Sequence, residues 1–467
     1  MAYSLLRRIW YTHNWSTIRA YVCKCEKKDR DERRKALIGN QIVEPFLPPR
    51  RVWDLYSNRV VPRWIMDIDD VRAVWRLWPD PISHAWVDEK DRADVWTPIN
   101  GYEWPVPVPK ESDLKLIRIE MLNLGLEYAW LDVLCLRQVG GPGEDMRTEE
   151  WKLDVPVIGA MYRQTEVVCY LSGLGRPLSL KEGDLDSDRC WFRRAWTLQE
   201  VGDKMVIAGD TPNGPMHANL RKGRKYETEL LTRFHKQLES TVDITHCIVS
   251  VALGEMQNRV STKPVDKVAG LAFLLWPETI PAYYEGQSLE EAWTALVNSM
   301  LTLGRGELFS LFPEPGNARA KWRPSWDQVM MKPLPTYDHG PHIFVHRDET
   351  GDEDSCDVYY IEKGLVQGLA VVEGGPRRGK LIFKNKGGIE RGFKIIANHT
   401  YPIPEDTYTL IDPGTVDLGM SCYRWVVGRS LPGGMFEKVS LVEIPRKKER
   451  RRLKKLRITE KRRYILI

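Results

Sequence analysis

Short apolar runs alternate with segments of helical periodicity through the middle of the chain. Four runs have the length and the apolar content of strands buried on both faces, and they lie at 81–86, 128–135, 166–171 and 204–208. Hydrophobic residues recur at helical spacing in the segments between them, which predicts helices over 112–126, 149–163 and 188–202. Pro156 is expected to kink the second helix. Strands joined by helix-length crossovers form a parallel sheet with helices on its faces, so the pattern predicts an α/β domain.

The pattern changes outside this α/β domain, which we place at 51–215. A basic arm over 1–50 ends in three prolines and is expected to be a spacer. The other expected parts are a helical region at 220–310, an irregular connection rich in Pro and Gly at 311–350, a small antiparallel β domain at 351–445 and a basic tail at 446–467.

Composition fits a globular protein, with 42% hydrophobic and 28% charged residues. No run of apolar residues is long enough for a transmembrane segment, and the first residues lack the apolar stretch of a signal peptide. The eight cysteines are scattered along the chain, which favours free thiols in a reducing compartment. We therefore expect a cytoplasmic or nuclear protein.

Positive charge is concentrated near the end of the sequence. Residues 446–463 contain twelve Lys or Arg and two Glu, although the net charge of the whole chain is only +5. A run of like charges repels itself when it is compact, so we expect this tail to be solvated and to project from the globular body. Nucleic acid or an anionic surface is the alternative partner for it.

Candidate chemistry lies at the strand ends, because open parallel sheets bind ligands beyond the carboxyl ends of their strands. This rule selects residues 83–88 after the first strand. Asp132 lies within an apolar run and needs a partner there, either in a site or in a structural pair with an Arg or backbone N–H groups. On the predicted helix 188–202, Trp196 and Glu200 share a face, and an indole over a carboxylate would raise its pKa. A surface Glu200 paired with an Arg is the alternative.

Two other patterns are weak. His339, His342 and His346 lie close together, but no Cys or Glu pattern of known spacing accompanies them, so we expect no metal site. The glycine-rich segment 374–380 lacks the Ser or Thr and the following helix of a phosphate-binding loop, so a hairpin turn is expected.

Residues 82–86, 128–138 and 191–200 form three blocks along the chain. In this order they resemble the signature blocks of the fungal heterokaryon incompatibility (HET) domain, and the lead-in 53–59 is similar to mushroom-type members. Val87 stands where the family often has Gly, and Leu136-Arg137 stands where it often has Ile-Asn.

The resemblance implies a role in non-self recognition, in which the domain triggers programmed cell death between incompatible cells. The HET domain in turn looks distantly like the TIR domain, a flavodoxin-like module that cleaves NAD in several lineages through a helical Glu. The segment 196–200 resembles the corresponding TIR motif and implies that Glu200 is catalytic. The expected substrate-binding residues are Ser83, Trp86, Asp132, Arg194 and Trp196.

NAD would then be a substrate, and no cofactor is expected. A homo-oligomer and a non-self trigger protein are the expected partners. The alternative is a non-catalytic scaffold that oligomerises through the parallel-sheet domain and binds a partner protein through the β domain.

Overall fold

The computed structural model describes residues 15–69, 78–202, 204–221, 225–243, 249–275, 277–334, 343–348, 353–372, 375–384, 388–412, 424–445, 449, 452–453 and 460–467. The chain forms two compact units. The first contains Met1–Cys247 and Asn258–Ser288, and the second contains Ile248–Gln257 and Leu289–Ile467. No helix in the described ranges is both long and apolar enough to cross a membrane.

A six-stranded sheet in the order β10-β9-β5-β8-β3-β4 forms the centre of the first unit. Four of its strands are parallel, as predicted: β5 (Asp80–His84), β8 (Tyr128–Leu131), β9 (Val167–Tyr170) and β10 (Met205–Ile207). The other two, β3 (Arg51–Asp54) and β4 (Arg59–Pro62), pair antiparallel. The sheet is therefore mixed, and the prediction of a purely parallel sheet is wrong at this edge.

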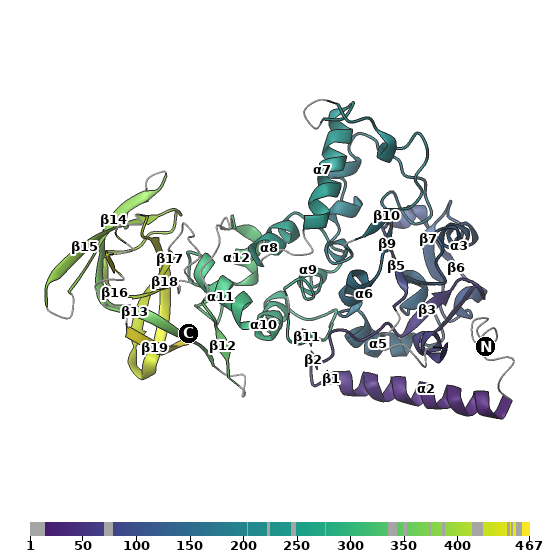
Figure 1. Cartoon of the computed structure of the whole chain (residues 1–467), viewed down its shortest axis with the longest axis horizontal. Helices are drawn as coiled ribbons and strands as arrows, with labels where there is room; N and C mark the ends of the chain where they lie inside the picture. Colours follow the sequence, from purple (N-terminus) through teal and green to yellow (C-terminus); the bar gives the residue numbers. More distant parts are fainter. Residues whose placement is uncertain are drawn as a thin grey trace. The chain divides into compact units, whose positions relative to one another are not determined.

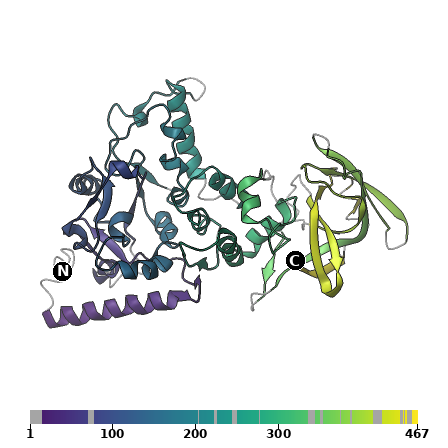
Figure 2. The same cartoon turned by 180° about the vertical axis from the view of Figure 1, so that it is seen from behind.

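Helices lie on either side of these strands (Figures 1 and 2). Every residue of β8 and β9 is buried, which explains why their sequences are continuously apolar. Helix α3 (Leu114–Asn123) begins after Asp113, whose side chain accepts a hydrogen bond from the N–H of Lys115 at 2.8 Å. The predicted helix 149–163 is two helices, α5 (Arg147–Asp154) and α6 (Ile158–Gln164), because the chain breaks near Pro156 rather than kinking.

The prediction of a helix over 188–202 is wrong. The segment contains two short 3-10 turns, Trp191–Arg193 and Trp196–Leu198. Arg194 between them is extended, with φ −79° and ψ 138°. Val260 pairs with the backbone on both sides of Arg194: its N–H donates to the Arg193 carbonyl at 2.6 Å, and its carbonyl accepts from the Ala195 N–H at 2.9 Å. These long-range bonds replace the bonds that a helix would have made.

The N-terminal segment is not the spacer that its prolines predicted. Residues Trp15–Ala36 form helix α2. Its Arg33 is buried and lies 3.4 Å from the carboxylate of Asp154 on α5, which also binds Arg50 at 2.7 Å. Beyond α2, the short strands β1 (Leu37–Ile38) and β2 (Gln41–Ile42) form a small antiparallel sheet with β11 (Ile280–Pro281).

Other elements complete the first unit. They are a hairpin of β6 (Arg92–Val95) and β7 (Val106–Pro109), the four-residue helix α4 (Asp132–Cys135), and the helices α7 (Glu229–Asp243) and α9 (Asp266–Ala269). Strand β8 is thus shorter than the predicted run 128–135, and Asp132 begins a helical turn instead of lying within the strand.

The second unit joins helices to an antiparallel sheet, as expected for residues after 351. Its helices are α8 (Val249–Gln257), α10 (Leu289–Ser299), α11 (Thr302–Leu311) and α12 (Trp326–Met331). Its strands are β12 (His346–Arg347), β13 (Asp354–Gln367), β14 (Arg377–Lys384), β15 (Glu390–Ala397), β16 (Asp406–Ile411), β17 (Arg424–Leu431), β18 (Met435–Glu443) and β19 (Glu460–Leu466). Pairing of β13 with both β14 and β16 closes the strands from β13 to β18 into a ring.

The end of the basic tail belongs to this sheet, so the prediction that the whole tail projects is wrong. Strand β19 pairs antiparallel with β13 over seven residues and parallel with β18. Tyr464 and Leu466 are buried, whereas the basic residues 461–463 are exposed. Among the other tail residues, 446–448, 450–451 and 454–459 lie outside the described residues.

Candidate functional site

A pocket of about 390 Å³ lies in the first unit, beyond the carboxyl ends of β5 and β8. This volume is in the usual range for small-molecule sites. Of the six residues that the sequence indicated, five line the pocket, namely Trp86, Asp132, Arg194, Trp196 and Glu200. Ser83 does not line it but contacts Glu200 directly. Residues that the strand-end rule selected therefore lie at or beside one pocket.

A chain of two hydrogen bonds holds Glu200. The Ser83 hydroxyl donates to Glu200 Oε2 at 2.6 Å, and the indole N–H of Trp191 donates to Ser83 Oγ at 2.7 Å. An indole N–H can only donate, so the hydroxyl must accept from Trp191 and send its own proton to the carboxylate. Ser83 and Trp191 are both buried, so their side chains are held in place, and the bonds from Trp191 to Ser83 and from Ser83 to Glu200 fix the position of the carboxylate.

The environment of Glu200 makes its carboxyl group a weak acid. Burial raises its pKa from 4.5 to about 7, and the negative charge of Asp132 acts in the same direction. The Ser83 hydrogen bond and the charges of His84 and Arg194 oppose the shift without cancelling it. Glu200 can therefore exchange a proton near neutral pH, which is the property expected of a catalytic carboxyl group.

A histidine and an aspartate lie beside Glu200. Nε2 of His84 is 2.9 Å from Oδ1 of Asp132, and its Nδ1 is 3.3 Å from the carbonyl oxygen of Ala85. Burial alone would lower the pKa of His84, but the charge and hydrogen bond of Asp132 outweigh it and raise the pKa. Because both ring nitrogens face acceptors, the protonated imidazolium is the form that satisfies both.

Aromatic side chains form much of the pocket wall. The rings of Trp196 and Tyr283 are 6.2 Å apart, and those of Trp151 and Tyr283 are 6.3 Å apart. The Tyr283 hydroxyl donates to Asp266 at 2.8 Å, and the Trp196 side chain also binds this carboxylate. Trp196 therefore lines the same pocket as Glu200, but not through the shared helix face that the sequence predicted. Flat aromatic walls suit planar ligand groups such as a nucleobase or a pyridine ring.

Cationic groups gather at one side of the pocket. The guanidinium of Arg92 lies over the Trp86 ring, 5.2 Å from its centroid, and Arg189 pairs with Asp88 at 2.7 Å. Arg194 is half-buried, and no ion pair or hydrogen bond of its side chain occurs with any residue in the described ranges. Burial and the charge of Arg189 lower the pKa of Arg194. These guanidinium groups could hold an anionic part of a ligand.

Several pocket residues come from a segment that sequence reasoning left out of the α/β domain. Asp266 and Tyr283 belong to residues 258–288, which we had assigned to a helical region. Arg147 and Trp151 on α5 were also missed. A polar residue on a helix carries no sequence signal that it will face a pocket, and only the fold brings 258–288 to the strand ends.

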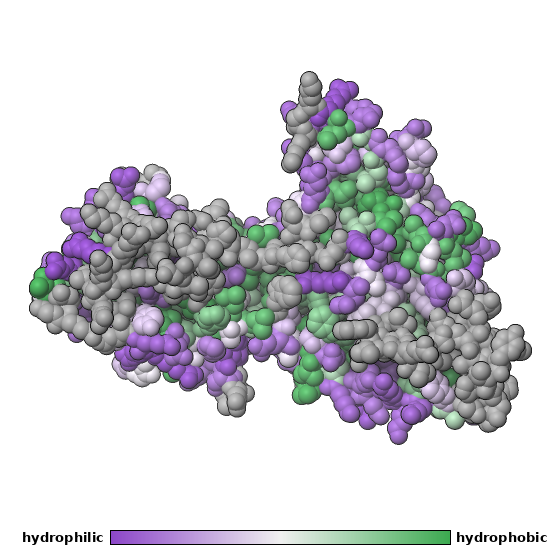
Figure 3. Space-filling view, in the orientation of Figure 1, coloured by the Kyte–Doolittle hydropathy of each residue, from purple (hydrophilic) through white to green (hydrophobic). Residues whose placement is uncertain are grey.

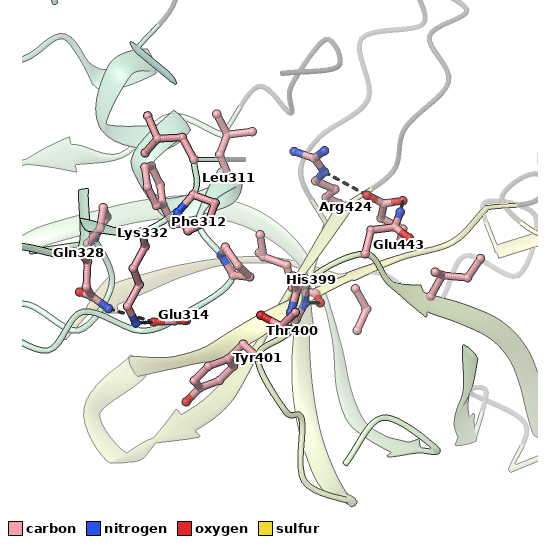
Figure 4. A pocket seen from close by; sticks show the side chains of 18 residues that line it. Leu311, Phe312, Glu314, Gln328, Lys332, His399, Thr400, Tyr401, Arg424 and Glu443 are labelled. Atoms are coloured by element: carbon pink, nitrogen blue, oxygen red, sulfur yellow. Dashed lines mark hydrogen bonds and ion pairs between the residues drawn. The ribbon is translucent and has the colours of Figure 1, made fainter. Parts of the chain in front are cut away.

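The second unit contains a larger pocket, of about 640 Å³ (Figure 4). Lys332 contacts Glu314 on one side of it, and Arg424 binds Glu443 at 3.1 Å on the other. Between them, His399 has Nε2 2.9 Å from the Leu441 carbonyl, and burial lowers its pKa. The charged groups of this pocket thus neutralise one another, so the pocket of the first unit is the stronger candidate for chemistry.

No group of His, Cys, Asp and Glu side chains within the described ranges is arranged to hold a metal ion. His339 and His342 lie outside those ranges. Comparison of the chain with models of protein families, with curated proteins and with solved structures finds no match. The residues of the site and the three sequence blocks are therefore the features that bear on function.

Proposed function

We propose that the first unit hydrolyses the bond between nicotinamide and ribose in NAD, as the death effector of a HET-type system of non-self recognition. The observation that carries the proposal is the half-buried Glu200, whose carboxylate accepts a hydrogen bond from Ser83 at 2.6 Å in an aromatic-walled pocket. The resemblance of 82–86, 128–138 and 191–200 to the HET signature blocks supplies the biological role.

The chemistry needs a carboxylate at this position. When the bond breaks, its electron pair goes to the pyridinium nitrogen, nicotinamide leaves as a neutral molecule, and positive charge develops at C1′ of the ribose. A carboxylate beside C1′ stabilises that charge, as in glycoside hydrolysis. Water then adds to C1′ and loses a proton, which gives ADP-ribose. Glu200 is the residue we assign to this role, in its ionised form.

The neighbours of Glu200 tune its ionisation. Charge on His84 and Arg194 favours the carboxylate form, whereas burial and Asp132 favour the neutral form. The pKa of about 7 lets Glu200 reach its ionised form near neutral pH. Aromatic rings line the pocket that holds Glu200, and a bound ligand that displaces water from it would strengthen the interaction of the carboxylate with the developing charge.

A flavodoxin-like, TIR-like classification of the α/β domain is part of the same proposal. Its support is the run of four parallel strands with Ser83 on β5 and Glu200 before β10. The antiparallel strands β3 and β4 at one edge are an addition to that plan. The two 3-10 turns before Glu200 are a departure from it.

The test is nicotinamide release from NAD by the purified full-length protein. We expect Glu200→Gln to abolish release, because the amide keeps the size and hydrogen bonding of the side chain but cannot carry negative charge. Glu182→Gln is the matched control, since Glu182 is exposed and does not line the pocket. Cells should be killed by the wild type and by the Glu182→Gln variant, but not by the Glu200→Gln variant. Equal release by wild type and Glu200→Gln would contradict the proposal.

A non-catalytic, oligomerising scaffold is the second candidate function. Leu116 and Ile119 are 65% and 49% exposed on α3, and hydrophobic residues gather over this helix in Figure 3. A second copy of the chain would cover such a face. If this is the function, the Leu116→Glu variant should have a lower mass in light scattering and should no longer kill cells. The Glu200→Gln variant should kill cells as the wild type does.

The remaining partners and the cellular location belong to the proposal. A non-self trigger protein would start the response in the cytoplasm or nucleus. Free thiols at Cys23, Cys25, Cys135, Cys169, Cys190 and Cys356 accord with such a reducing compartment. The positive charge of the sequence 446–463 would favour binding to nucleic acid or to an anionic surface.

A further inference from the structure

We infer that Arg194 is an anion subsite that binds the phosphate on the same ribose whose C1′ faces Glu200, so that the pocket selects phosphorylated nucleosides. The identity of the nucleoside rests on the proposed function. The anion subsite itself rests on the position of Arg194 and on the absence of an ion pair or hydrogen bond between its side chain and any residue that the structure describes.

Arg194 is a half-buried charge that lacks a contact partner among the described residues. Its neighbours differ from it in this respect. Arg189 pairs with Asp88 at 2.7 Å, and Arg92 pairs with Glu89 at 3.3 Å. The charges of Arg189 and Arg92 also repel that of Arg194 and lower its pKa, after the larger effect of burial. A half-buried cation beside like charges becomes more favourable when an anion binds it.

The two carboxylates whose charges favour ionised Arg194 are held by other groups. Glu200 accepts the Ser83 hydroxyl at 2.6 Å, and Asp266 accepts the Tyr283 hydroxyl at 2.8 Å and a bond from Trp196. Both carboxylates interact with Arg194 through their charge, but neither lies within ion-pair distance of it. Arg194 is therefore kept from closing the pocket with an internal salt bridge.

The backbone of Arg194 is fixed, which makes its side chain a preorganised anchor. Its carbonyl accepts hydrogen bonds from Arg259 Nη1 at 2.8 Å and from the Thr197 hydroxyl at 2.9 Å. Val260 binds the residues on either side of it. These bonds hold Arg194 in the extended conformation that replaced the predicted helix, so the irregular backbone of this segment has a positional role.

Phosphate is the anion that best fits this arrangement. A guanidinium group binds phosphate with two parallel hydrogen bonds, and such charge-assisted bonds are strong in a partly buried site. In nicotinamide mononucleotide and in NAD, a phosphate is attached to the 5′ carbon of the ribose that carries nicotinamide. A single sugar then separates the group bound by Arg194 from the carbon beside Glu200. Binding energy at the phosphate would orient the scissile bond.

The experiment measures binding without turnover. Full-length Glu200→Gln protein is titrated calorimetrically with nicotinamide mononucleotide and with nicotinamide riboside, which differ only in the phosphate. We expect the mononucleotide to bind about 10- to 100-fold more tightly, since a hydrogen-bonded charged group contributes on that scale. Adding Arg194→Gln should remove this preference and leave the affinity for the riboside unchanged.

Arg193→Gln is the matched control, because Arg193 is the adjacent arginine, pairs with Asp188 at 3.2 Å and does not line the pocket. It should keep the preference for the mononucleotide. Arg194→Lys, which keeps the charge but loses the planar fork, should give an intermediate preference. Equal melting temperatures of the variants would show that all of them are folded.

Equal binding of the two ligands, no binding of either, or an unchanged preference in Arg194→Gln would overturn the inference. These outcomes are separate from the proposed hydrolysis, which is read from nicotinamide release by the wild-type protein. A preference that depends on Arg194, without any nicotinamide release, would support the anion subsite and contradict the hydrolysis. Release of nicotinamide by the wild-type protein, together with a preference for the mononucleotide that Arg194→Gln does not change, would support the hydrolysis and contradict the anion subsite.

Discussion

Neutralising Glu200 should change the pH dependence of stability in a direction that its burial dictates. In the folded protein, burial raises the pKa of this carboxyl group from 4.5 to about 7. Between these two values the folded protein keeps a proton that the unfolded chain has released. Stability therefore falls as pH rises through this window and levels off above pH 7. The shift corresponds to about 3 kcal/mol, at roughly 1.4 kcal/mol for each pKa unit.

Glu200→Gln removes this titration. We expect the variant and the wild type to have similar stability near pH 4.5, and the variant to be more stable at pH 8 by up to about 3 kcal/mol. The pKa near 7 already includes the favourable charges of His84 and Arg194, so their loss in the variant needs no further correction. An amide oxygen can still accept the hydrogen bond from Ser83.

The assay is urea unfolding followed by tryptophan fluorescence, at pH steps from 4.5 to 8. The chain has two units, so the transition that responds to the mutation is the one to compare. Titrating groups of the second unit are present in both proteins and cancel in the difference. Glu182→Gln should show no pH-dependent difference. A constant difference between Glu200→Gln and wild type across the range would refute the argument that the carboxyl group is desolvated.

Three further predictions concern the parts that support the site and the β sheet. Deleting 460–467 should lower the melting temperature of the second unit clearly in calorimetry, because it removes the buried Tyr464 and the strand paired with β13; an unchanged value would show that β19 contributes nothing. Asp154→Asn should lower the free energy of unfolding in urea by about 2 kcal/mol, because it removes the buried carboxylate that binds both Arg33 and Arg50, and a neutral effect would contradict these pairs. Burial lowers the pKa of Lys438 to about 7, so the stability of the folded protein should rise with pH above 7. Lys438→Met should abolish that rise in urea unfolding, and the same pH dependence in variant and wild type would contradict the burial of a titrating Lys438.

The parallel strands could be predicted because buried strands have a recognisable sequence pattern. A strand covered on both faces needs apolar residues at every position, and β8 and β9 meet that requirement. The antiparallel strands β3 and β4 lie at one edge of the sheet, and β4 has exposed residues, so it lacks such a run. The end of the basic tail was wrongly predicted to be solvated, because the prediction used its many charged residues. The alternating apolar residues Tyr464 and Leu466, which are typical of a strand, were not taken into account.

The failure at 188–202 has a specific physical cause. The i, i+4 spacing of Trp196 and Glu200 suits a helix but does not require one. The outcome was decided by Val260, which bonds to the backbone on both sides of Arg194. Periodicity within a window cannot include a partner so far along the chain. Ser83 and Glu200 were both predicted as site residues, Ser83 from the strand-end rule and Glu200 from the motif resemblance, and the strand-end rule does not depend on the conformation of the segment that carries Glu200.

The same long-range contact shows which part of the chain makes the site complete. The three sequence blocks end at residue 200, but Val260 sets the backbone of Arg194, and Arg259 binds its carbonyl. Asp266 and Tyr283, from the same segment, supply a carboxylate and an aromatic wall to the pocket. Glu200, in contrast, is positioned wholly within the blocks, by Ser83 and Trp191. The blocks therefore contain Glu200 and the two residues that position it. The anion subsite also requires residues 258–288, because Arg259 and Val260 fix the backbone around Arg194.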